Sequence, residues 1–223
     1  MQYRKEPLVS GSVYHVYSRS IAKYVIFNNA QDFNRLINIL DLYRFNNFNF
    51  KYSRFLNLDK KLQAAIINEM KKSGQVDVQI IAYCLMPTHI HLILKQITDK
   101  GISNFMAKTL NCYTRYHNIK FKRTGPLWAG RFKSVLVKSD EQLLHLSRYI
   151  HLNPTSAGLV KKPQDWDFSS YQEYLGQSNL QLCSFDGLFD FTPKQYQEFV
   201  NDRKSYQKNL SIIRKIIIED YAG

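Results

Sequence analysis

The sequence predicts an α+β fold: a ferredoxin-like antiparallel sheet with helices on one face, followed by a C-terminal helical extension. Two observations predict it. Segments that alternate apolar and polar residues, as strands do, are separated by segments whose apolar residues recur every three or four positions, as in amphipathic helices. Their order is strand, helix, insertion, two strands, helix, strand and helix, which is typical of a split β-α-β arrangement.

The first half of the chain supplies a strand, a helix and an insertion. We expect the strand at about 11–19 and an amphipathic helix at about 28–47, with Asn29 or Gln31-Asp32 near its start. Residues 46–75 are read as an insertion that contains a helix from about Leu58 to Lys72, closed by Ser73-Gly74.

The second half begins with two strands at 76–85 and 88–96, joined at Met86-Pro87. A long helix at about 102–121 follows, with Ser103 as its expected N-cap. Next come a short strand at 132–138 and a helix from Asp140 to about Asn153. This helix is expected to begin at Ser139 or Asp140 and to end before Pro154, because proline disfavours helical geometry at the preceding residue.

Two domains are expected along the chain. Residues 1–176 would form the catalytic domain, and residues 177–223 a linker followed by a helical tail from about Thr192 to Tyr221. Three cysteines without CxxC spacing favour a reducing compartment over a disulfide frame or a structural zinc site. The sequence contains neither a signal-peptide core nor a long apolar span, so we expect a cytoplasmic protein without a membrane partner.

Charge points to a polyanionic partner. Lys and Arg number 31 against 18 Asp and Glu, a formal net charge of +13. No acidic residue lies between Asp99 and Asp140, where basic and aromatic residues alternate, a combination suited to single-stranded nucleic acid. Some of these aromatic residues would instead belong to a helix core. The candidate DNA-binding residues are Arg115, Lys120, Lys122, Arg123, Trp128, Arg131 and Lys133.

Two histidines flank one apolar residue in His89-Ile90-His91. On a strand they project from the same face while Ile90 enters the core. Such a pair either binds a metal ion or serves as a structural polar pair. On the helix at 140–153, Tyr149 and Asn153 lie one turn apart on one face, and an asparagine oxygen is a suitable ligand for Mg²⁺ or Mn²⁺.

If strand and helix meet, a metal would hold a scissile phosphate and Tyr149 would attack it in line. Spacing alone does not show that they meet. Tyr113 and Tyr116 are rival nucleophiles, but neither has an amide side chain four residues later. His15 and His145 either assist the chemistry or are structural.

Four motifs in order resemble a known family. Residues 86–92, Met-Pro-Thr-His-Ile-His-Leu, resemble the HUH motif (histidine, bulky hydrophobe, histidine) of single-tyrosine transposases that act on single-stranded DNA. Residues 123–133 resemble the basic G-x-L-W-x-x-R-(F/Y)-K segment of the REP-associated tyrosine transposases (RAYT) of the insertion-sequence group. Residues 149–160 match their Tyr-Ile-x-x-Asn-Pro-x-x-Ala-Gly-x-Val signature, and residues 165–176 continue it.

This resemblance implies a metal-dependent transposase or strand transferase that recognises hairpins in single-stranded DNA. It implies His89, His91 and Asn153 as ligands of Mg²⁺ or Mn²⁺, and Tyr149 as the nucleophile that forms a 5′-phosphotyrosine. A homodimer is compatible with it. The alternatives are a domesticated, non-catalytic binder of hairpin DNA and a replication initiator or relaxase with the same chemistry. An RNA-binding ferredoxin-like module is less favoured, because no RNA-recognition-motif signature is visible.

Overall fold

The computed structural model describes residues 7–185, 187–188 and 190–202. Its centre is a four-stranded sheet in the order β2-β3-β1-β4, in which every neighbouring pair is antiparallel. This order confirms the predicted α+β, ferredoxin-like class. The strands are β1 (Val13–Arg19), β2 (Val78–Met86), β3 (His89–Gln96) and β4 (Lys133–Leu136).

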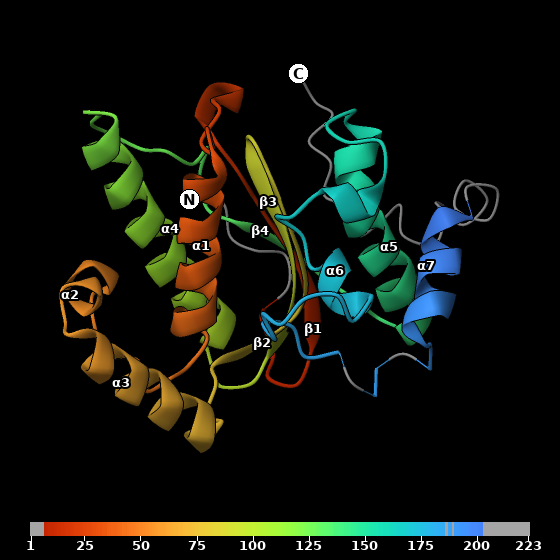
Figure 1. Ribbon diagram of the computed structural model, residues 1–223, viewed down its shortest axis with the longest axis horizontal. Coiled ribbons are helices and arrows are strands. Elements are labelled where there is room, and N and C mark those ends of the chain that lie inside the picture. The colour runs from red at the N-terminus through yellow and green to blue at the C-terminus, as the bar shows by residue number, and fades with distance from the viewer. Residues whose placement is uncertain (1–6, 186, 189, 203–223) are drawn as a thin grey trace.

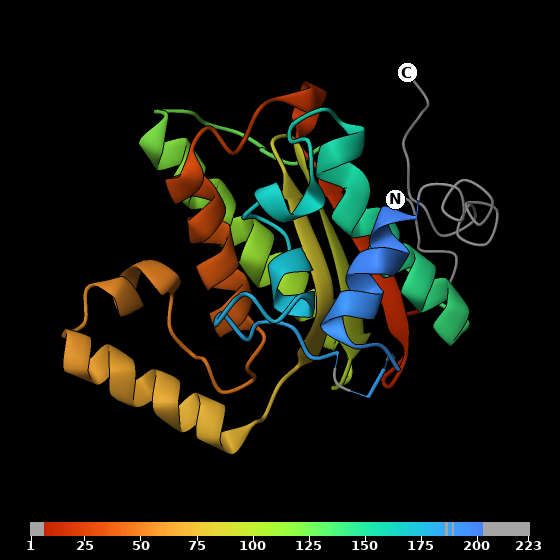
Figure 2. The same cartoon turned by 45° about the vertical axis from the view of Figure 1, so that its right-hand side comes forward.

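Helices cover both faces of the sheet (Figures 1 and 2). On one face lie α1 (Ala30–Tyr43) and α4 (Gly101–Lys120). On the other lie α5 (Asp140–Ser156), α6 (Tyr171–Tyr174) and α7 (Pro193–Asn201).

The prediction of helices on one face therefore holds for α1 and α4 and is incomplete for the sheet as a whole. The reason is that the central strands are apolar on both sides. Ile90 and Leu92 belong to the core under α1 and α4, whereas Ile81 and Ile93 belong to a second core under α5. A sheet buried on both faces carries nearly continuous apolar runs, as β2 and β3 do.

The predicted insertion forms an excursion outside the α1 and α4 layer (Figure 2). It contains α2 (Tyr52–Leu56), which the sequence analysis missed, and α3 (Lys60–Ser73), which it predicted. Gly74 ends α3 in the left-handed conformation, at φ +62°. An isolated bridge between Phe45 and Val76 brings the two ends of the excursion together.

The starts of the helices agree with prediction except at α4. Asn29 and Ser139 cap α1 and α5 with their side chains, as expected. The N-cap of α4 is Lys100 and not Ser103, and it has left-handed geometry without a side-chain cap. The turn is set by packing, because the helix starts with Gly101 pressed against the backbone of Asp77.

The prediction that helix α5 ends before Pro154 is wrong. The helix continues to Ser156. A proline in the last turn removes only one helical N–H donor, and the turn is completed around it. The amide of Ala157 donates to the carbonyl of Asn153, and that of Leu159 donates to the carbonyl of Pro154.

The remaining elements are two short 3-10 turns and the start of the C-terminal tail. The turns are η1 (Ile21–Lys23) and η2 (Pro163–Asp165). A capping box of Thr192 and Gln195 begins α7, and Tyr196 and Val200 pack into the core under α5. The rest of the predicted tail helix, beyond residue 202, lies outside the described residues.

Candidate active site

The two histidines of β3 point to the face of the sheet that α5 covers. Their imidazole centroids are 5.1 Å apart and nearly perpendicular. Ile90, between them, is fully buried in the core on the opposite face. The alternation of the strand thus places both rings side by side, as the sequence predicts.

Helix α5 brings Tyr149 to these histidines. Leu146 and Ile150 are fully buried and seat the helix on the sheet. The Tyr149 ring then stands edge-on to the His91 ring, with centroids 6.0 Å apart and ring planes at 90°. The strand and the helix, 58 residues apart in sequence between these two side chains, therefore meet in space.

Strand β1 adds two aromatic side chains from the neighbouring register positions. Tyr17 pairs with His91, and its ring lies 4.9 Å from that of His91 and 5.6 Å from that of His89. His15 stacks on His91, and its Nε2 is 3.0 Å from Nδ1 of His91 in a buried hydrogen bond. This bond fixes the orientation of the His91 ring and leaves its Nε2 for another ligand.

Both histidines are held neutral. Burial lowers the pKa of His89 to about 4. Burial also lowers the pKa of His91 well below its ordinary value, and the neighbouring His15 and His89 reinforce that shift. A neutral imidazole is the form that binds a metal ion, so at neutral pH both rings are in the protonation state that coordination would require.

Asn153 lies one turn after Tyr149 on α5. Its buried amide nitrogen has no hydrogen-bond partner among the described residues. Nδ1 of His89 forms a hydrogen bond with the Thr88 hydroxyl at 3.0 Å, so Nε2 is the ring nitrogen that could coordinate a metal ion. No group of three or more His, Cys, Asp or Glu side chains placed for a metal ion occurs in the described residues. The two imidazoles lie together, and Asn153 stays the predicted third ligand.

Two of the predicted DNA-binding residues lie beside this site. Arg131 and Lys133 are exposed and line a small pocket of about 220 Å³ together with Tyr17 and Arg19. Since Tyr17 also contacts both histidines, this pocket places positive charge next to the imidazoles. Positive side chains here can neutralise a phosphate backbone that enters the site.

The other predicted DNA-binding residues lie elsewhere. Arg115 and Lys120 line a second pocket between α1, α4 and the insertion. Lys122 is exposed just after α4, and the Arg123 guanidinium lies 4.9 Å from the centroid of the Tyr24 ring.

Trp128 is a correction. Its side chain is only 8% exposed and belongs to the core under α1 and α4, where its indole nitrogen donates to the carbonyl of Leu110. Because its face is covered by the core, it is not available to stack on a base.

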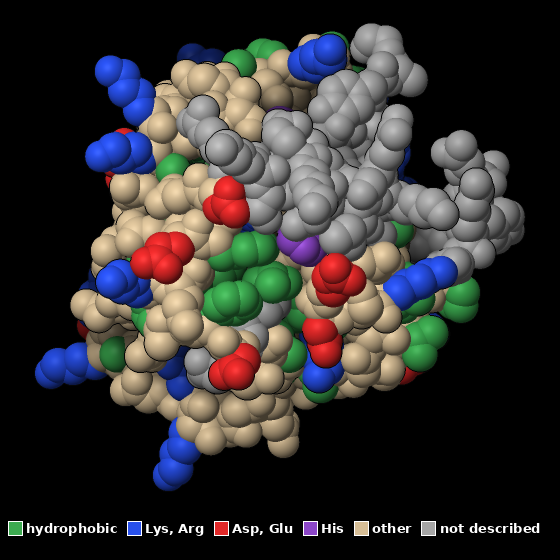
Figure 3. Space-filling model, turned by 90° about the vertical axis from the view of Figure 1, so that its right-hand side faces the viewer, with side chains coloured by type: hydrophobic (Ala, Val, Ile, Leu, Met, Phe, Trp, Pro, Cys, Tyr) green, Lys and Arg blue, Asp and Glu red, His purple; other side chains and the backbone are tan. Residues whose placement is uncertain are grey.

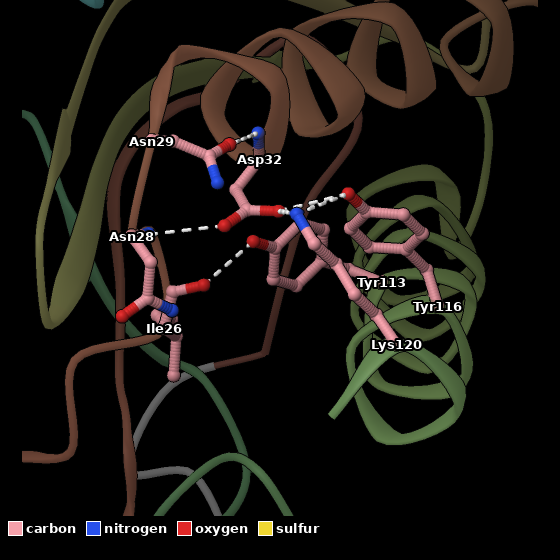
Figure 4. A network of polar contacts seen from close by, with 7 residues as sticks. All are labelled: Ile26, Asn28, Asn29, Asp32, Tyr113, Tyr116 and Lys120. Atoms are coloured by element: carbon pink, nitrogen blue, oxygen red, sulfur yellow. Dashed lines mark hydrogen bonds and ion pairs between the residues drawn. The ribbon is translucent and has the colours of Figure 1, made fainter. Parts of the chain in front are cut away.

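The rival tyrosines lie on the opposite side of the sheet from the histidines. Tyr113 is fully buried and donates to the carbonyl of Ile26, and burial raises its pKa. Tyr116 donates to Asp32, which also pairs with Lys120 (Figure 4). Both hydroxyls are committed to joining α4 to the chain around α1, which leaves Tyr149 beside the imidazoles.

His145 and His151 of α5 have structural surroundings. His145 packs against Phe199 of α7, with ring centroids 5.5 Å apart. His151 is fully buried between the hydroxyls of Tyr196 and Ser170, each 2.8 Å from a ring nitrogen.

Figure 3 views the molecule from the side of α5 and α7. Acidic side chains surround a group of hydrophobic ones there, and the basic side chains that are described lie toward the margins (Figure 3).

Among the described residues, no helix is both long and apolar enough to cross a membrane.

Comparison with known proteins agrees with this fold. Residues 48–153 match the family described as "Transposase IS200 like". A "Putative REP-associated tyrosine transposase" of Haemophilus influenzae is 28% identical over 104 residues, which is 42% of this chain and 58% of that protein. A "REP-associated tyrosine transposase" of Escherichia coli is 27% identical over 94 residues, covering 42% and 54%. The chain spans little more than half the length of these curated relatives.

A solved structure of a REP-associated tyrosine transposase bound to a REP hairpin has the same fold. The TM-score is 0.55 at 17% identity, over 86% of this chain and 96% of that one. Residues 48–153 are thus similar to the IS200-like class of transposases. More particularly, the chain is related to the REP-associated tyrosine transposases, which confirms the resemblance that its motifs indicated.

Proposed function

We propose that this chain is a metal-dependent strand transferase that cleaves and rejoins single-stranded DNA carrying hairpins, through a 5′-phosphotyrosine on Tyr149. The observation that carries the proposal is the contact between the rings of Tyr149 and His91. It joins a nucleophile on one element to a metal-ligand candidate on another. The names of the relatives support the choice of DNA and of a hairpin as substrate.

In the proposed reaction, the Tyr149 hydroxyl oxygen attacks a phosphorus of the DNA backbone in line with the leaving 3′ oxygen. The new bond joins tyrosine to the 5′ phosphate, and the bond to the 3′ oxygen breaks. The phenol gives up its proton, and the departing oxygen takes one up to become a 3′-hydroxyl. Because the phosphodiester energy is kept in the covalent link, a 3′-hydroxyl can reverse the step without ATP.

His89, His91 and Asn153 would hold Mg²⁺ or Mn²⁺. The neutral imidazoles fit such an ion, and the side-chain oxygen of Asn153 is the ligand type that Mg²⁺ and Mn²⁺ accept. When bound, the ion supplies polarisation of the scissile phosphate. Arg131 and Lys133 would bind the backbone at the entrance, next to Tyr17.

The hairpin is the proposed partner, because a solved relative with the same fold is bound to one. A homodimer, a cytoplasmic location and the division of the chain at residue 176 stay predictions from the sequence.

The test is incubation of the protein with end-labelled hairpin-containing single-stranded DNA and Mn²⁺ or Mg²⁺. We expect a protein–DNA adduct that survives denaturation and is absent in Tyr149→Phe, because the phenylalanine ring keeps the packing but lacks the attacking oxygen. His89→Ala should abolish the metal-dependent adduct while most DNA binding remains.

Tyr113→Phe is the matched control, since it removes one tyrosine hydroxyl on the opposite side of the sheet. Its adduct yield should equal that of the parent protein. An adduct that persists in Tyr149→Phe would refute the assignment of the nucleophile. DNA binding without an adduct, across varied hairpins and both metals, would leave the non-catalytic binder as the function.

A further inference from the structure

A second pocket lies on the helical layer that faces away from the histidines. It has a volume of about 750 Å³, within the range of about 300–1,000 Å³ typical of small-ligand sites. Its walls come from α1, α4 and the aromatic segment before and at the start of α2. The candidate active site uses none of its residues.

The pocket is strongly positive. Among the described residues that line it, none is acidic. Its cationic side chains are Arg35, Lys51, Lys108, Arg115 and Lys120. In the described part of the chain, only Lys120 of these has a carboxylate partner, Asp32 at 2.6 Å. The other four charges are available to an anion.

Aromatic rings accompany the charges. The Arg35 guanidinium lies between two rings, 4.4 Å from the Tyr52 centroid and 4.8 Å from that of Tyr116. Its Nε is buried and has no hydrogen-bond acceptor among the described residues. Phe50 lines the same pocket and leaves 40% of its surface exposed, although exposed aromatic side chains are costly to leave in water.

The walls of the pocket are fixed before any ligand arrives. Tyr116 and Lys120 of α4 both bind the buried carboxylate of Asp32 on α1, at 2.8 and 2.6 Å (Figure 4). Burial by itself would raise the pKa of Asp32, but the hydrogen bonds from Lys120, Tyr116 and the backbone amide of Asn28, together with the charge of Lys120, outweigh it and hold the pKa below its usual value. The backbone amide of Tyr52 donates to the Tyr43 hydroxyl and ties the insertion to α1. A preformed site loses little entropy on binding.

We propose that this pocket binds an unpaired nucleotide of single-stranded DNA, with the base stacked on Phe50 and the flanking phosphates held by Arg35, Lys108 and Arg115. Charges without acid partners beside an exposed aromatic ring are the combination that captures single strands. An apolar ligand would leave the charges unused, and a simple anion would leave the ring unused. The choice of DNA over other single strands rests on the proposed function.

The pocket is lined by α1 and α4, which lie on the opposite face of the sheet from α5, the helix that carries Tyr149 (Figure 1). A nucleotide held there is not the one that is cleaved. The pocket is instead an anchor, which grips an unpaired stretch of the substrate away from the reacting phosphate.

The experiment measures binding in the Tyr149→Phe background, so that it does not depend on the proposed chemistry. The probe is a fluorescent hairpin flanked by unpaired thymidines, followed by anisotropy. Phe50→Ala should weaken binding at least about five-fold, the loss expected from one base stack. Phe191→Ala is the matched control, because this phenylalanine is equally exposed, at 41%, but lies outside the pocket.

Charge is tested with Arg115→Ala on α4 against Arg54→Ala, an exposed arginine of the insertion that does not line the pocket. Arg115→Ala should weaken binding more and make it less dependent on salt. Photocrosslinking from 4-thiothymidine at the unpaired positions should label the peptide that contains residues 48–52.

Equal affinities of Phe50→Ala and Phe191→Ala, or crosslinks confined to the β3 and β4 side, would overturn the proposal. An equal loss of heparin binding by Phe50→Ala would also overturn it, because heparin has no base to stack. If the parent protein forms no Tyr149 adduct but Phe50→Ala still weakens DNA binding, the anchor proposal stands and the strand-transferase proposal is refuted.

Discussion

The position of single side chains decides whether the pair His89 and His91 is oriented to coordinate a metal ion. His15 is the informative case, because its ring both stacks on His91 and bonds to Nδ1 of that ring. The sequence shows the histidine pair through its spacing of two, but the role of His15 depends on the register of β1 against β3, which no local pattern reveals. Trp128 was misjudged for the same reason, because only tertiary packing distinguishes a core indole from a stacking platform.

Replacing His15 by alanine should weaken Mn²⁺ binding about 10- to 100-fold, which is the usual cost of losing a partner that orients a ligating histidine. Isothermal titration of the purified protein with Mn²⁺ measures it. His15→Asn, which can restore a hydrogen bond to Nδ1, should recover part of the affinity.

His145→Ala is the control, since that ring packs against Phe199 and not against the pair. Unchanged Mn²⁺ affinity in His15→Ala would mean that the bond to His91 does not position it.

At the scale of elements, periodicity predicted the spans of β1, α1, β3 and α4 well, because each has one or two faces that must be apolar. The ends were less predictable. The end of α5 was missed because a proline signal was read as a stop, while one lost donor in a last turn is tolerated. The start of α4 was missed because a contact with a distant turn, and not a capping side chain, sets it.

Gly101→Ala tests that contact. A Cβ at this position would stand 2.3 Å from the Asp77 carbonyl oxygen, so the helix start or the loop before β2 must shift. We expect a loss of about 1–3 kcal/mol in the free energy of unfolding, as for other overpacked sites. Urea denaturation measures it.

Asn104→Ala serves as the comparison, because this exposed residue lies in the same first turn and alanine favours helix. It should be neutral or slightly stabilising. Equal stabilities of the two variants would show that the turn before α4 adapts freely.

For the whole molecule, the order of strands and helices along the chain was enough to predict the sheet, since few topologies suit that pattern. The second helical layer was not predicted as such, although the apolar runs of β2 and β3 carried the signal. The face of the sheet that this second helical layer covers holds histidines in neutral form. Burial lowers the pKa of His151 to about 3 and that of His89 to about 4.

This burial makes stability depend on pH. Above the unfolded-state pKa of about 6.5, such a histidine is neutral in both the folded and the unfolded chain, so it does not change the free energy of unfolding. As pH falls from about 6.5 toward 4, the unfolded chain takes up protons that the folded one refuses. The free energy of unfolding should therefore fall by up to about 1.4 kcal/mol per pH unit for each such histidine.

His151→Gln should reduce this slope while it keeps hydrogen-bonding capacity toward Ser170 and Tyr196. Urea denaturation at pH 7, 6, 5 and 4 compares the two proteins. Parallel curves over that interval would show that His151 is protonated without unfolding.

The bridge between Phe45 and Val76 joins the two ends of the excursion that contains α2 and α3. The chain leaves the domain and returns to it at neighbouring points, and the amide of Asp77 donates to the carbonyl of Arg44 at the same place. Insertions or deletions at exposed positions between these points can change the excursion without shifting any strand of the sheet. The excursion that lines the second pocket can therefore change while β3 and its two histidines keep their positions.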